Sequence, residues 1–220
     1  MCNLYSITKS QDAVRRWFGT ARDMAGNLPP LRDVYPDSMA PIVRIGGDGV
    51  RELRMMRWGF PPPPNLGTRP VTNIRNTNSS YWRGWLTPRY RCLVPATSFC
   101  EWTDSQPKVP HWFALGEDRP LFAFAGIWRP WTGTRGTKSA PVEGEHLLFS
   151  FLTTEPNDVV RPIHAKAMPV SLTEPREFEA WLTAPVGDAL RLQRSFPNSR
   201  LKIVAKGLKA DEVVEPAAYV

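Results

Sequence analysis

The sequence predicts an α+β fold, in which one domain spanning residues 1–220 forms around a largely antiparallel, barrel-like β-sheet with peripheral helices. Apolar runs typical of buried strands fill the middle of the chain, whereas helical patterns lie near its start and late in it. With 42% apolar residues and nine tryptophans, 220 residues can bury a sizeable core without disulfides. We see no repeat and no linker, which favours one domain.

The first half predicts one helix, one hairpin and one loop. Residues 7–19 are expected to contain a short amphipathic helix that Thr8 or Ser10 can cap and that Gly19 ends. Residues 40–58 alternate around a Gly-rich turn at 46–49, which is typical of a hairpin. The run "PPPPN" at 61–65 indicates an extended surface loop.

The second half predicts five strands and two helices. The segment "RCLVPATSFCEW" (91–102) contains two strands with a break at Pro95, and further strands are expected at 111–115, 121–128 and 146–154. Residues 132–145 are expected to form a loop or hairpin tip. Residues 173–182 form a helix capped by Thr173, and 185–196 form a shorter one.

Composition also limits the cellular setting. No apolar run approaches the roughly 18 residues of a membrane span, and the start lacks a secretory signal. Three cysteines are too few for a disulfide framework. We therefore expect a monomer in a reducing cytoplasm, associated with the nucleoid if the protein is bacterial.

The charge is strongly basic and unevenly placed. The net charge is +7, from 21 Arg and 7 Lys against 21 acids. Between positions 51 and 91 there are eight arginines and one acid, interleaved with aromatic residues. Arginines among aromatics suit an unpaired nucleic-acid strand. The alternative is a basic surface over ordinary core aromatics.

Few residues are candidates for chemistry. His111 and His146 are interpreted as structural, whereas His164 lies in a loop after a strand, where catalytic groups often lie. Glu101 stands among apolar residues in "SFCEW", so either burial raises its pKa and makes it a general acid/base, or it faces solvent. No metal motif or nucleotide fingerprint is present, so we expect neither a metal nor a cofactor, and Cys92 and Cys100 are interpreted as core.

Cys2 is either incidental or a nucleophile. If Met1 is removed, Cys2 carries a free α-amine, with a pKa of about 7.7–8.0, beside its thiol. Such a 1,2-aminothiol condenses with an aldehyde to a five-membered thiazolidine ring. The sequence alone leaves both interpretations open.

Several motifs together resemble the SRAP family, the SOS response-associated peptidases or abasic-site shielding proteins. They cover most of the chain and keep the family's order. The motifs are "MCNLY" (1–5), "RWGF" (57–60), "NIR" (73–75), "WR" (82–83), "RCLVPATSFCEW" (91–102), "FAGIW" (124–128) and "TTEPN…RPIHAKAMPV" (153–170). The resemblance implies an SRAP-like fold and covalent capture of abasic sites in single-stranded DNA.

The resemblance also implies residue roles. Cys2 would bond the sugar aldehyde, Asn73 would hold the Cys2 end or the sugar, Glu101 would serve as acid/base, and His164 would assist ring opening. The same four would remove Met1, and an elimination (lyase) side activity is implied. The expected strand-contacting residues are Trp58, Arg75, Arg83, Trp102 and Lys166.

The chain departs from the commoner family pattern at three places. Leu4 stands where an arginine is usual, Asn76 replaces an acid, and "HAKAMP" is one residue longer than "HDRMP". Asn3 and Leu4 are therefore where altered DNA contacts are expected. Two other functions stay open: a cysteine peptidase acting on other proteins, and a non-covalent single-strand binder.

Overall fold

The structure is a computed structural model that describes residues 2–63, 67 and 69–212. Two sheets and a few short helices make up the described chain, so the predicted α+β class is confirmed. None of the helices in this part of the chain is long and apolar enough to cross a membrane.

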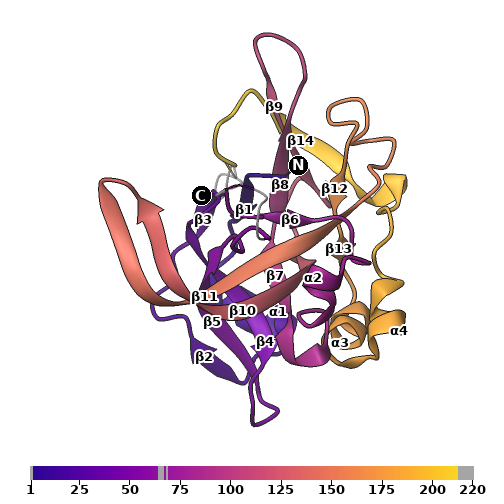
Figure 1. Ribbon diagram of the computed structural model, residues 1–220. Helices are drawn as coiled ribbons and strands as arrows, with labels where there is room; N and C mark the ends of the chain where they lie inside the picture. Colours follow the sequence, from indigo (N-terminus) through magenta and orange to yellow (C-terminus); the bar gives the residue numbers. More distant parts are fainter. Residues whose placement is uncertain (1, 64–66, 68, 213–220) are drawn as a thin grey trace, which may run out of the picture.

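The larger sheet closes into a five-stranded barrel (Figure 1). Antiparallel pairing runs from β5 through β4, β7 and β10 to β11, and parallel pairing of Leu148 with Arg57 and of Phe149 with Trp58 joins β11 back to β5. The barrel strands are β4 (Met39–Ile45), β5 (Arg51–Trp58), β7 (Arg91–Ala96), β10 (Phe122–Thr137) and β11 (Ala140–Thr154). The short strands added to them are β2 (Arg22–Met24), β6 (Asn73–Ile74), β12 (Met168–Pro169) and β13 (Ser171–Leu172).

The predicted hairpin at 46–49 is confirmed as the connection between β4 and β5. The Gly46 N–H donates to Val50 O at 2.8 Å, and the Gly49 N–H donates to Gly46 O at 3.0 Å. Gly49 has φ of 80°, which a glycine adopts without strain. The "PPPPN" loop is described only as far as residue 63.

The second sheet carries the N-terminal strand in its interior. Its order is β14 (Lys202–Lys206), β9 (Pro110–Ala114), β8 (Ser98–Trp102), β1 (Tyr5–Ile7) and β3 (Leu31–Val34). The chain crosses from the barrel to this sheet at Thr97, whose N–H donates to Ser6 O. The break expected at Pro95 was therefore placed two residues early. Pro95 has no N–H to donate, and β7 tolerates it because β7 pairs with β4 only at Leu93, so no hydrogen bond to β4 is lost at position 95.

Both sheets share one aromatic core. Tyr5 of β1 is fully buried, with its ring edge-on to Trp58 at 5.2 Å and to Phe124 at 5.6 Å between ring centroids. Edge-to-face rings pack favourably beyond their buried area. This cluster anchors β1 in the core and thereby fixes the position of Cys2, which lies three residues before Tyr5.

The helices form where local signals place them. In α1 (Gln11–Phe18), Ser10 Oγ accepts from the Ala13 N–H, and Gly19 ends the helix in the left-handed conformation. In α3 (Pro175–Thr183) the N-cap is Glu174 rather than Thr173, one residue later than expected. The other short helices are α2 (Ser80–Arg83), α4 (Val186–Leu190), which is shorter than the expected 185–196, and the 3₁₀ turns η1 (Pro88–Tyr90) and η2 (Asn198–Arg200).

Of the two structures expected for residues 132–145, a loop or a hairpin tip, the hairpin is confirmed, and it is a long two-stranded ribbon. The pairing of β10 with β11 continues without interruption from Gly126 opposite Phe151 to Thr137 opposite Ala140. Figure 1 shows this ribbon as an arm that leaves the barrel at the left of the view. The end of the ribbon next to its turn is held in place, because Asp37 accepts from the Gly136 N–H at 2.9 Å and pairs with Arg135 at 2.9 Å.

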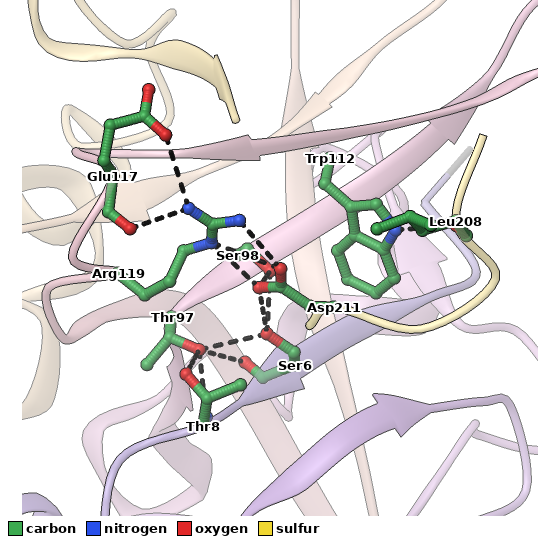
Figure 2. A network of polar contacts seen from close by, with 9 residues as sticks. All are labelled: Ser6, Thr8, Thr97, Ser98, Trp112, Glu117, Arg119, Leu208 and Asp211. Atoms are coloured by element: carbon green, nitrogen blue, oxygen red, sulfur yellow. Dashed lines mark hydrogen bonds and ion pairs between the residues drawn. The ribbon is translucent and has the colours of Figure 1, made fainter. Parts of the chain in front are cut away.

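A buried carboxylate ties the end of the described chain to the second sheet (Figure 2). Asp211 is fully buried, and its Oδ2 accepts from Ser6 Oγ at 3.1 Å and from Ser98 Oγ at 2.5 Å. Arg119 approaches the same carboxylate with Nε at 3.2 Å and Nη2 at 3.0 Å. The ion pair therefore links β1, β8 and the segment after β14.

Asp211→Asn is expected to lower the unfolding free energy by about 3 kcal/mol, because it leaves the buried Arg119 charge without its counter-ion. Urea denaturation measures this change. Asp188→Asn is the matched control, since Asp188 pairs with Arg191 on an exposed helix surface and should cost at most about 0.5 kcal/mol. Equal midpoints for the two variants would contradict the assigned role of Asp211.

Candidate functional site

The site forms where the N-terminal segment meets the start of β6. The Cys100 N–H donates to Leu4 O at 2.9 Å, which holds the first residues against β8. Asn73 opens β6, is 7% exposed, and lies opposite Phe151 of β11. Its Nδ2 donates to Cys2 O at 2.8 Å. Two residues that are 71 positions apart are thus in direct contact.

A short chain of hydrogen bonds extends this contact. Asn73 Nδ2 also donates to Thr72 Oγ1 at 2.8 Å, and Thr72 Oγ1 donates to Asn3 Oδ1 at 3.2 Å. Asn73 Oδ1 is buried, and no described residue donates to it. An acceptor is therefore available beside the backbone of Cys2.

Glu101 supplies a buried carboxyl to the same place. It is 2% exposed in β8, so of the two interpretations of its position the buried one is correct. Burial raises the pKa of Glu101 from 4.5 to about 7. A carboxyl with that pKa is populated in both protonation states at neutral pH and can give or take a proton.

The Cys2 thiol is held protonated. Cys2 is 1% exposed, and its Sγ donates to Leu4 O at 3.4 Å. Burial, followed by the negative charge of Glu101, raises the pKa of the Cys2 thiol well above its ordinary value. The sulfur therefore requires a proton acceptor before or during its attack.

His164 reaches the site from the segment between β11 and β12. Its Nδ1 lies 3.9 Å from Glu101 Oε2, and its side chain is 12% exposed. Burial lowers the pKa of His164 below its ordinary value, so the ring is neutral at pH 7. The structure thus brings all four residues Cys2, Asn73, Glu101 and His164 to one place, from four separate segments.

Glu101 should make the stability of the fold depend on pH. Its folded-state pKa of about 7 exceeds the ordinary 4.5, so the folded chain binds more protons than the unfolded chain between these values. The unfolding free energy should therefore fall by about 3 kcal/mol as pH rises through this window, and Glu101→Gln should remove that fall. Urea denaturation of both proteins at pH 4.5 and 8 measures it. Parallel pH dependences for the two proteins would contradict the buried carboxyl.

One of the five expected strand-contacting residues is misplaced. Trp58 is fully buried, its Nε1 donates to Thr72 O at 3.1 Å, and its ring stacks on Phe151. The expectation that Trp58 lines a strand-binding groove is therefore wrong. Its ring belongs to the core, and it supports the Thr72 backbone beneath the site.

The other four keep accessible side chains. Arg83 and Lys166 are exposed, and Trp102 is half-buried. Arg75 is exposed and forms an ion pair with Glu155, while Gln193 Nε2 donates to Arg75 O at 2.9 Å. Altered DNA contacts were expected at positions 3 and 4. Leu4 is buried in the core, so only Asn3, which is exposed, can make such a contact.

The remaining cysteines and histidines lie in structural surroundings. Cys92 and Cys100 are free and buried. The His111 ring hydrogen-bonds to Val109 O, just before strand β9, and His146 stacks on Trp131. Within the described ranges no group of three or more His, Cys, Asp or Glu side chains could hold a metal ion.

Sequence reasoning missed two residues that join the site. Thr72 lies between Asn3 and Asn73 in the hydrogen-bond chain, and Gln193 fixes the backbone after Asn73 by donating to both Arg75 O and Thr153 O. Only the place of Thr72 directly before the "NIR" motif could have indicated it. Nothing in the sequence around Gln193 marks it.

Comparisons with known proteins agree on one family. The family model described as SOS response associated peptidase (SRAP) matches residues 1–207. The chain is 30% identical over 203 residues to the abasic site processing protein YoqW of Bacillus subtilis (strain 168), covering 88% of this chain and 85% of that protein. It is 31% identical over 195 residues to the abasic site processing protein YoaM of the same organism, covering 83% and 79%.

Solved structures share the fold. A crystal structure of a protein from Bordetella bronchiseptica matches with a TM-score of 0.71 at 22% identity, covering 96% of this chain and 100% of that one. Another from Bacteroides thetaiotaomicron matches with a TM-score of 0.69 at 22% identity, covering 91% and 90%. The two-sheet architecture is therefore common to all three proteins.

Proposed function

The chain belongs to the SOS response associated peptidase (SRAP) family, and from that premise we propose that it processes abasic sites in single-stranded DNA by bonding to them covalently through Cys2. The observation that carries the proposal is the convergence on Cys2 of Asn73, Glu101 and His164. The names of the curated relatives supply the substrate class.

The reaction begins with hydrolysis of the Met1–Cys2 peptide bond, which consumes one water and releases methionine. The new α-amine attacks the aldehyde carbon of the ring-opened sugar, and the hydroxyl formed leaves as water to give an imine. Cys2 Sγ then adds to the same carbon, and its proton passes to the nitrogen. The net reaction with the aldehyde forms one thiazolidine ring and releases one water.

The residues of the site fit these proton movements. Glu101, with a pKa of about 7, can accept a proton from the amine or the thiol and return it to the leaving hydroxyl. His164 is neutral, so its ring N–H can donate to the sugar oxygen as the ring opens. Asn73 holds the Cys2 carbonyl, and its buried Oδ1 can accept an N–H of the new α-amine.

Electrostatics favours a nucleic-acid substrate. The chain carries a net charge of +7. Arg75 and Lys166, each two residues after a site residue, are exposed and can contact phosphates on either side of a bound lesion. The imine stage also permits elimination of the adjacent phosphate, which would give a lyase side activity.

Peptidase action on other proteins fits the geometry less well. Cysteine peptidases use a thiol whose pKa is lowered, whereas burial raises the pKa of Cys2. Cleavage of the chain's own Met1–Cys2 bond needs one turnover and no peptide-binding groove. A purely non-covalent strand binder would need no proton transfer, so it would not account for the carboxyl buried at Glu101.

A denaturing gel tests the proposal. Wild-type protein incubated with a single-stranded oligonucleotide containing one abasic site should give a band that survives heating and migrates as protein plus DNA. The same oligonucleotide with an intact base should give none. Absence of a heat-stable band with the abasic strand would sink the proposal.

A further inference from the structure

Asn3 is an exposed amide directly beside the reacting residue. Its neighbours Cys2 and Leu4 are each 1% exposed, so Asn3 alone of these three residues presents its side chain at the surface. Consecutive Cα atoms lie about 3.8 Å apart, which places this amide within reach of whatever is bonded to Cys2.

The hydrogen-bond chain fixes which end of the Asn3 amide faces outward. Asn73 must present its NH₂ group to Cys2 O, because a carbonyl only accepts. The same NH₂ group donates to Thr72 Oγ1, so that oxygen acts as the acceptor there. The single hydroxyl hydrogen of Thr72 is then left for Asn3, which must offer its Oδ1.

The outward end of Asn3 is therefore a hydrogen-bond donor. No described residue accepts a hydrogen bond from Asn3 Nδ2, and the side chain is exposed. A DNA backbone presents phosphate and sugar oxygens, which accept hydrogen bonds. An outward Oδ1 would repel such a backbone, whereas an outward NH₂ group attracts it.

We propose that Asn3 is a substrate-recognition residue, whose Nδ2 donates to a non-bridging phosphate oxygen flanking the lesion while Thr72 holds its Oδ1. The inference rests on the proposed function, since it takes the bound molecule to be a DNA strand. A hydrogen bond to a charged oxygen is stronger than one between neutral groups, so one contact can affect affinity measurably. It also gives the site a phosphate contact from the N-terminal segment, in addition to the contacts from Arg75 and Lys166, which lie later in the chain.

The Asn3→Asp substitution tests the outward donor of the amide separately from its inward acceptor. It keeps an acceptor for Thr72 but replaces the outward donor by a carboxylate oxygen. The probe is a labelled single strand with a tetrahydrofuran site, which has no aldehyde and cannot form the covalent bond. By fluorescence anisotropy, Asn3→Asp should bind this strand about tenfold more weakly than wild type. Its Met1 should be removed as completely as in wild type, by intact mass.

Asn76→Asp is the matched control, because Asn76 is also exposed and follows Arg75. It adds the same charge near the same strand and should weaken binding less than about threefold. Thr72→Val should also weaken binding, because the Asn3 amide then loses its orientation. Equal affinities of Asn3→Asp and Asn76→Asp would overturn the inference, and so would retention of Met1 in Asn3→Asp, which would show that Asn3 only positions Cys2.

The readout separates this inference from the proposed function. If the strand with the tetrahydrofuran site binds in an Asn3-dependent way while an abasic strand gives no covalent adduct, the covalent function fails and the role of Asn3 stands. If wild type does not bind the tetrahydrofuran strand, the role of Asn3 fails.

Discussion

Glu101→Gln is expected to slow adduct formation by about 10²- to 10⁴-fold at pH 7, because it removes the only carboxyl that the structure places beside Cys2 in the described chain. Glutamine fills nearly the same volume and keeps a hydrogen-bonding head, so the loss isolates proton transfer. Quenched time courses with excess protein over abasic strand measure the rate of the covalent step.

One control variant and one stability measurement make this result specific. Glu145→Gln removes a carboxylate from the exposed β10–β11 arm and should leave the rate unchanged. Glu101→Gln should also be the more stable protein above pH 7, since it no longer buries an ionised carboxylate. A Glu101→Gln rate within threefold of wild type would remove Glu101 from the mechanism.

Cys2→Ala is expected to abolish the heat-stable adduct altogether. Because Cys2 is itself expected to take part in removing Met1, the variant is first treated with an aminopeptidase that removes Met1. It then has a free α-amine and can form the imine, but it has no sulfur to close the ring. Imines hydrolyse on heating, so no band should remain on the denaturing gel. Adding borohydride during the reaction should reduce the imine and restore a stable band.

Cys100→Ala is the matched control for this change. Cys100 is a second buried thiol, and it packs with Leu4 and Trp112 in a small buried cluster. Its loss should lower stability while the folded protein forms the adduct normally. A heat-stable adduct from Cys2→Ala without borohydride would assign the bond to another residue.

The elements that the sequence predicted well are those with burial on one side. Val14 and Phe18 of α1 share a buried face between Ser10 and Gly19, so periodicity and caps agree. The arm at 132–145 has no such signal. Residues 140–145 are all exposed, and the Gly, Thr and Glu residues of the arm are typical of loops. Hydrogen bonding along a ribbon leaves no hydrophobic pattern to detect.

The site was predictable only in part, for a similar reason. Glu101 stood out because a carboxyl within an apolar strand is costly unless it has a use. Trp58 was misplaced because an aromatic next to arginines suggests stacking, whereas its neighbours in space are Tyr5 and Phe151. The link from Asn3 through Thr72 to Asn73 joins segments about 70 positions apart, and only the folded chain brings them together.

The intact mass of the purified protein–DNA adduct tests the central claim most directly. The account predicts a single species whose mass equals the chain without Met1 plus the abasic oligonucleotide minus one water, with the modification on Cys2 after digestion. An adduct that retains Met1, or one attached elsewhere in the chain, would contradict the aminothiol mechanism.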